Sequence, residues 1–168
     1  RSGLPTAQGR PSPRPLIAHH SAILDPRHNL PADYPLVTDE YLDRLQDTYV
    51  EAARLAGKAG FDGVDVKSCH RYLVSELLAS HTREGKYGGS LENRTRFLRE
   101  VMGRIRHEVP EVFVTTRMNV YDAISHPFGF VTGSPNISKN TLRRNSSASS
   151  MAFWRFWRMA SALSRIAA

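Results

Sequence analysis

Apolar residues recur along this chain with two different periods, and each change of period marks a predicted element. From Thr38 to Gly60 the period is helical, and Thr38 can cap a helix whose first turn carries two acids. The apolar face predicted for this helix consists of Leu42, Leu45, Tyr49, Ala52 and Ala56. Residues 61–66 form a short apolar run bounded by glycine, which favours a buried strand over a helix.

The same alternation repeats further along the chain. A short helix is predicted around residues 72–79, and a polar loop over residues 80–89. Ser90 can cap a second long helix that carries Phe97, Val101 and Ile105 on one face. Residues 111–117 have the composition of a second strand, which ends in Arg117. Alternating helices and strands are typical of crossover units with a parallel sheet, although the pattern does not distinguish a barrel from an open sheet.

Composition divides the chain into three regions, residues 1–37, 38–133 and 134–168. The first region holds seven of the ten prolines and is expected to be rich in loops, without long helices. The second region holds the predicted helix–strand units. The third begins with a segment rich in Ser and Asn, typical of a flexible linker, and ends with mixed aromatic and cationic residues that can form a short amphipathic helix.

The distribution of charge argues against a nucleic-acid partner. The chain has 23 Lys and Arg against 16 Asp and Glu, a formal charge of +7. Six of those cations and none of the acids lie in residues 134–168, so the preceding residues are nearly neutral. The basic tail suggests either a peripheral membrane binder or an extension without a selected role. Membrane binding is the less favoured of these, and no apolar run is long enough for a membrane span.

The cysteine and the paired histidines limit the chemistry that can be expected. Cys69 is the single cysteine, which excludes an internal disulfide and fits a reducing, cytoplasmic location. We expect it to be inert packing rather than a nucleophile. The adjacent pair His19 and His20 suggests a metal, but neighbouring residues rarely face one ion and no further ligands follow at a recognisable spacing. No metal site is therefore predicted.

The first predicted strand ends in a polar cluster, which is where barrel enzymes keep their chemistry. From the residues alone, Lys67 can either line a site or pair with a nearby acid at the strand end. His70 and Tyr72 can likewise belong to a site, or be a hydrogen-bonded core histidine and a packed aromatic ring. Arg117 at the end of the second strand can either belong to a site or form a salt bridge.

Several motifs together resemble the middle of the old yellow enzyme family of NADH:flavin oxidoreductases. They are the runs at residues 52–56 and 60–66, then His70 with Tyr72, then residues 87–94 with Arg96-Phe97. The likeness extends more loosely from about residue 9 to residue 122. It implies an FMN-dependent (β/α)₈ barrel, and thus an α/β fold with parallel strands and crossover helices.

The resemblance also implies a mechanism. Lys67 and His70 would hold an oxygen of an unsaturated carbonyl-type substrate, and Tyr72 would donate a proton to its α-carbon as general acid. Arg117 would lie near N1 and the C2 oxygen of FMN. NADH or NADPH would reduce FMN, and hydride would then pass to an activated alkene. The glycine motif at residues 87–94 is expected to be a tight turn that feeds a capped helix.

The chain departs from the family pattern in ways that limit these implications. Lys67 stands where a histidine is commonest, so an anionic or a carbonyl substrate is implied. Leu4 and Ala7 replace an N-terminal glutamine and histidine of the flavin site. A barrel of this type takes about 250 residues, so this chain is expected to be a partial (β/α)₈ TIM barrel with an irregular basic tail.

A partial barrel leaves two hypotheses besides the enzyme: a non-catalytic interaction module and a membrane binder through the tail. Because an unclosed sheet has unpaired edges, we expect self-association of the isolated chain. Light scattering checks this prediction, and a stable monodisperse monomer would contradict it.

Overall fold

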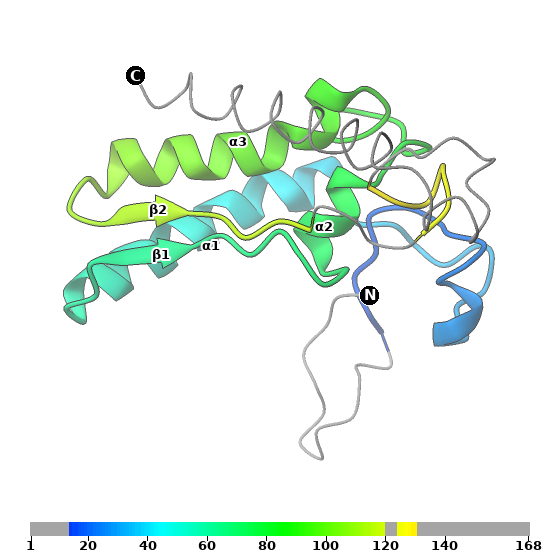
Figure 1. The fold of residues 1–168 in the computed structure, drawn as a ribbon, viewed down its shortest axis with the longest axis horizontal. Helices are drawn as coiled ribbons and strands as arrows, with labels where there is room; N and C mark the ends of the chain where they lie inside the picture. Colours follow the sequence, from blue (N-terminus) through cyan, green and yellow to red (C-terminus); the bar gives the residue numbers. More distant parts are fainter. Residues whose placement is uncertain (1–13, 120–123, 131–168) are drawn as a thin grey trace, which may run out of the picture.

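The computed structural model describes residues 14–119 and 124–130 (Figure 1). The elements in order are a 3₁₀ helix η1 (Pro26–His28), α1 (Asp39–Lys58), β1 (Gly63–Asp65), α2 (Leu73–Leu78), α3 (Leu91–Glu108) and β2 (Phe113–Thr115). The positions of Leu4 and Ala7 and the tail at residues 134–168 lie outside the described residues. No helix in the described ranges is long and apolar enough to cross a membrane.

Both long helices begin at the predicted caps. The Thr38 hydroxyl accepts a hydrogen bond from the Tyr41 amide at 3.1 Å, and the Ser90 hydroxyl accepts one from the Asn93 amide at 3.2 Å. Each bond satisfies a backbone donor that the helix itself cannot pair. In α3 the predicted face is confirmed, because Phe97, Val101 and Ile105 are all buried.

The predicted face of α1 is wrong in part. The buried residues are Leu42, Gln46, Val50 and Ala53, whereas Ala52 is exposed. The face is displaced because Gln46 is buried with partners from outside the helix. Its amide donates to the Tyr87 hydroxyl at 2.9 Å and to a Glu100 carboxylate oxygen at 2.7 Å. Hydrogen bonds of this kind offset the cost of burying a polar side chain.

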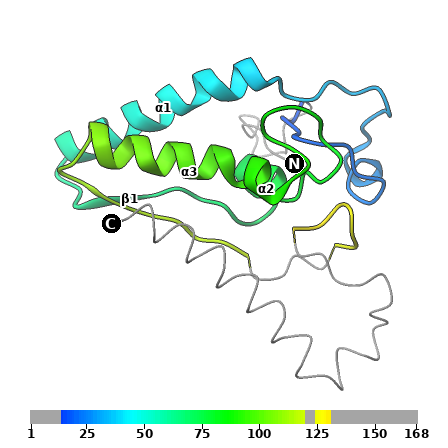
Figure 2. The same cartoon turned by 90° about the horizontal axis from the view of Figure 1, so that it is seen from above.

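The two strands pair in parallel, which confirms the predicted crossover arrangement. Gly63 is opposite Phe113 and Asp65 is opposite Thr115, and a further parallel bridge joins Ser68 to Met118. Both strands are shorter than the predicted runs, since β1 covers only part of residues 61–66 and β2 only part of residues 111–117. In Figures 1 and 2, α1 and α3 run alongside each other on the same side of the strand pair.

Among the described residues, helices cover one face of the strand pair and leave the other face bare (Figure 2). The covered face contributes four side chains to the hydrophobic core beneath the helices. Val66 is buried in this core, and the partly buried Val64, Val114 and Met118 pack against it. Alternate positions point the other way, as a pleated strand requires. Phe113 on that bare face is 62% exposed. In a closed barrel the bare face would be the interior.

Each strand has only one neighbour among the described residues. The outer edges of β1 and β2 therefore present backbone groups without strand partners in this part of the chain. The expected self-association through open edges stays a prediction, and it has this physical basis.

Candidate functional site

The site is built where the two strands end. The ladder continues past β1, since the Val66 amide donates to the Thr115 carbonyl at 2.8 Å and the Ser68 amide donates to the Arg117 carbonyl at 2.9 Å. The pairing keeps one register from Gly63 opposite Phe113 to Ser68 opposite Met118. This register places Lys67 opposite Arg117. Because side chains alternate along a strand, both positions belong to the bare face.

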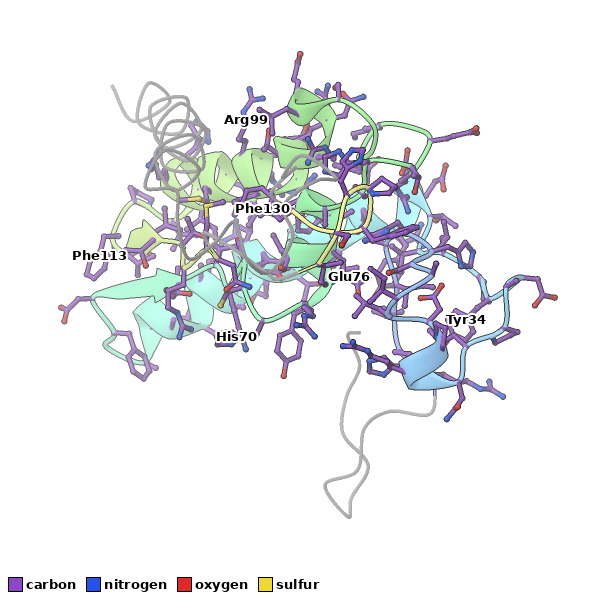
Figure 3. All side chains as sticks on the ribbon, turned by 45° about the vertical axis from the view of Figure 1, so that its right-hand side comes forward. Tyr34, His70, Glu76, Arg99, Phe113 and Phe130 are labelled. Carbon is purple, nitrogen blue, oxygen red and sulfur yellow. The ribbon has the colours of Figure 1, made fainter. Side chains whose placement is uncertain are left out.

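A tight connection carries the chain from the strand end to α2. His70 and Arg71 both have φ of +59°, a left-handed conformation that is uncommon outside glycine. The Tyr72 amide donates to the Cys69 carbonyl at 3.4 Å, and Tyr72 then precedes the first residue of α2. Cys69 itself is buried, in keeping with a packing role. Figure 3 shows His70 on this connection, near the end of β1.

Lys67 and Tyr72 are brought together by this turn. The Lys67 ammonium lies over the Tyr72 ring, 3.9 Å from its centroid. An ammonium at this distance from an aromatic face is held by the ring quadrupole. The alternative was an ion pair between Lys67 and a nearby acid. Among the described residues Lys67 has no such ion pair, and the nearby Asp65 pairs with Arg117.

The exposure of His70 and Tyr72 bears on their structural alternatives. His70 is exposed, so it is not a core histidine. Tyr72 is 46% exposed, so its ring is not fully packed away. Both side chains are accessible to solvent, and their role at a site stays a prediction.

Arg117 is placed at the same strand end but has a partner. Its Nε–H donates to an Asp65 carboxylate oxygen at 3.0 Å, and its side chain is 65% exposed. The salt bridge considered from the sequence is thus present. A guanidinium carries five N–H donors in a planar fork, and this contact uses the one on Nε, so the pair with Asp65 is compatible with a second partner.

The glycine motif at residues 87–94 has a structural role. Tyr87 is fully buried, and its hydroxyl donates to Asp43, which also accepts from the Lys86 ammonium at 2.6 Å. Burial, reinforced by the hydrogen bond to Asp43, raises the pKa of Tyr87 to about 12. The hydrogen bond from Lys86 is the main reason that the pKa of Asp43 is lowered. Tyr87 therefore stays a neutral phenol and anchors the loop to α1.

Sequence reasoning missed a buried cluster that holds the N-terminal segment against the helices. Arg83 is buried, and its guanidinium donates to the Ala18 carbonyl at 3.0 Å and to Asp39 at 2.6 Å. A Glu76 carboxylate oxygen accepts from the Ala18 amide at 2.9 Å. Figure 3 shows Glu76 between the helices and this segment. The partners are 44 to 65 residues apart, so no local pattern identifies them.

The two adjacent histidines of this segment have local partners. An imidazole nitrogen of His19 lies 3.0 Å from the His20 carbonyl, and one of His20 lies 3.2 Å from an Asp25 carboxylate. Over residues 14–119 and 124–130, no three His, Cys, Asp or Glu side chains gather as metal ligands would.

A second pair of histidines joins the loop after α2 to residues 124–130. The rings of His81 and His126 meet edge to face with centroids 5.0 Å apart, and His81 Nε2 lies 3.2 Å from the Gly129 carbonyl. Burial, followed by the positive charge of Arg94, lowers the pKa of His81 to about 4. His81 is therefore neutral near pH 7.

We predict that an NMR pH titration of the histidine ring signals will give His81 a midpoint near pH 4. Because the folded pKa lies below the ordinary histidine value of about 6.5, the unfolded chain binds more protons between these two pH values. The contribution of His81 thus makes the folded state less stable as pH falls from about 6.5 to about 4. The His81→Asn variant should lose this part of the pH dependence, and a His81 midpoint at or above 6.5 would contradict the prediction.

A parallel strand pair with helices on one face and polar side chains at its carboxyl end is the arrangement of a βα unit in an α/β enzyme, and it is compatible with a barrel. The sequence model of the NADH:flavin oxidoreductase / NADH oxidase family matches residues 25–153. The chain belongs to this family, which uses FMN with NADH or NADPH as reductant.

Curated relatives match the chain over part of its length. NADPH dehydrogenase of Clostridium acetobutylicum is 47% identical over 62 residues, which are 36% of this chain and 18% of that protein. The NADH-dependent flavin oxidoreductase iliE of Hypocrea jecorina is 40% identical over 83 residues, 48% of this chain and 21% of that protein. The chain thus spans about a fifth of the length of the curated relatives it matches.

Solved structures show the same fold. The old yellow enzyme homologue of Zymomonas mobilis superposes with a TM-score of 0.51 at 33% identity, over 58% of this chain and 27% of that chain. The old yellow enzyme of Pichia sp. AKU4542 has a TM-score of 0.50 at 30% identity, over 66% of this chain and 35% of that chain. Both are TIM barrels, and the parallel strands and helices described here correspond to a part of such a barrel.

Proposed function

We propose that this chain belongs to an FMN-dependent NAD(P)H oxidoreductase of the ene-reductase type, which reduces an activated alkene. The observation that carries the proposal is that Lys67, His70, Tyr72 and Arg117 all follow the carboxyl ends of the two paired strands, beside the bare face. Family membership supports the cofactor and the reductant.

The residues present fit part of an FMN site. Arg117 lies at the carboxyl end of β2 with a largely exposed guanidinium. Such a cation can donate hydrogen bonds to the N1 and C2-oxygen edge of the flavin ring, and Asp65 holds it in position at 3.0 Å. When bound, FMN supplies the hydride that it has received from NADH or NADPH.

The remaining side chains act on the substrate. Lys67 and His70 would donate hydrogen bonds to the oxygen conjugated to the alkene, and would stabilise the negative charge that develops there as hydride adds to the β-carbon. Tyr72 would donate its phenolic proton to the α-carbon as general acid. The 3.9 Å contact places the Tyr72 ring beside the Lys67 ammonium, which supports a joint role of the two side chains.

A second candidate function is an interaction module without catalysis. The observation in its favour is the bare sheet face with the exposed ring of Phe113, together with two strand edges that have no partner among the described residues. A module of this kind would bind further barrel strands rather than a small molecule. The membrane hypothesis depends on residues outside the described ranges.

The test is turnover. The purified 168-residue chain is incubated with FMN, NADH or NADPH, and an α,β-unsaturated ketone, and the saturated ketone is measured. The proposal expects saturated product that requires both FMN and the nicotinamide. The proposal would be contradicted if product formed equally well without the protein, or if FMN-loaded protein formed no product. Binding of a separate barrel segment without product would favour the interaction module.

A further inference from the structure

We propose that the site selects alkenes conjugated to a carboxylate, with Lys67 as the residue that determines this specificity. The inference rests on the proposed function, because it names the substrate class of that site. It depends on charge, on the contacts of Lys67 and on the chemistry of hydride addition.

The bare face of the strand pair has an excess of positive charge. It carries two cations, Lys67 and Arg117, and one acid, Asp65. The Asp65 carboxylate is engaged by Arg117 at 3.0 Å and lies 3.4 Å from the Thr115 hydroxyl. Within the described ranges no carboxylate lies within ion-pair distance of the Lys67 ammonium. One positive charge at the strand end is therefore left for a ligand.

The position of Lys67 suits a carboxylate rather than a neutral carbonyl. Its ammonium rests on the Tyr72 ring, which fixes it without neutralising its charge, and the N–H groups that point away from the ring can donate to a ligand. His70, three residues later, is exposed and can donate to a second oxygen. A carboxylate offers two acceptor oxygens and a full charge, and hydrogen bonds between charged partners are about twice as strong as neutral ones.

The chemistry also needs this cation. Hydride addition to the β-carbon moves the alkene electron pair toward the carboxylate, which would then carry two negative charges. The Lys67 ammonium offsets the second of these. The α-carbon takes the phenolic proton of Tyr72, and the phenolate recovers a proton from water. In total, one enoate, one NAD(P)H and one proton give one saturated carboxylate and one NAD(P)⁺.

Binding measured without turnover tests the inference. Ligand-observed NMR titrations of the full chain, without NADH or NADPH, would compare cinnamate with cinnamamide, which has nearly the same shape and no charge. We expect cinnamate to bind about tenfold more tightly, as one charge-assisted hydrogen bond allows. Lys67→Gln should remove this preference and Lys67→Arg should retain it. The matched control is Lys58→Gln, at the far end of α1, which changes the net charge equally and should leave the preference intact.

Three outcomes would overturn the inference: equal binding of the two ligands, a preference that survives Lys67→Gln, and absence of cinnamate binding. A separate FMN titration distinguishes failure of the carboxylate specificity from failure of the proposed function. FMN uptake with equal ligand binding would refute the carboxylate specificity alone. Carboxylate preference through Lys67 without FMN uptake would support the specificity and refute the proposed function.

Discussion

Replacement of Gly88 by alanine is expected to lower the free energy of unfolding by about 3 kcal/mol, the upper range for overpacking. A Cβ atom at this position would lie 2.3 Å from the Arg83 carbonyl oxygen and 2.7 Å from its carbonyl carbon. These are backbone atoms, so they cannot move aside by a rotamer change. Arg83 is also held by its hydrogen bonds to Ala18 and Asp39. The new methyl group must therefore displace the loop or the N-terminal segment.

Urea unfolding measures the effect, and Gly103→Ala is the matched control. Gly103 lies inside α3, and a Cβ atom there would meet nothing within 4 Å. Alanine is favoured over glycine in a helix interior by about 1 kcal/mol, so the control should be at least as stable as the parent chain. Equal stability of the Gly88 and Gly103 variants would contradict the close approach of residues 83 and 88.

Replacement of Tyr72 by phenylalanine is expected to slow alkene reduction by about 10²- to 10⁴-fold, the usual contribution of a positioned general acid. Phenylalanine keeps the ring that supports the Lys67 ammonium and removes only the phenolic proton. The reduction of bound FMN by the nicotinamide does not use this proton, so its rate should be unchanged. Rapid-mixing kinetics of the two half-reactions make the measurement.

Tyr41→Phe is the control for this prediction, since it makes the same change on α1, where Tyr41 packs against the core. It should leave both half-reactions unaffected. If Tyr72→Phe slowed neither half-reaction, the proton would have to come from another donor. If it slowed both equally, the Tyr72 hydroxyl would have a role in binding rather than in proton transfer.

The helices were predictable because their signals are local. Thr38 and Ser90 are caps with donors three residues later, and the apolar spacing of α3 is regular, so its start and its buried face both agree with the structure. The face of α1 was displaced by Gln46, whose burial depends on Tyr87 and Glu100. Those partners are 41 and 54 residues away, and no periodic pattern within α1 contains them.

The site was predictable only in part. A strand that ends in polar residues predicts a site by topology, and the family likeness added the roles of the side chains. The contact of Lys67 with Tyr72 depends on the left-handed conformations of His70 and Arg71, which propensity disfavours. The pairing of His81 with His126 and the burial of Arg83 depend on how loops pack, so neither has a signal in the sequence.

The most direct test of the central claim, that the strand ends form a flavin site, is an absorption titration of the purified chain with FMN. We expect saturable uptake of one FMN per chain, with a change in the flavin spectrum, and weaker uptake by Arg117→Gln. A colourless protein that takes up no FMN would contradict the claim. It would leave the family membership intact and reduce this chain to a non-catalytic part of a barrel.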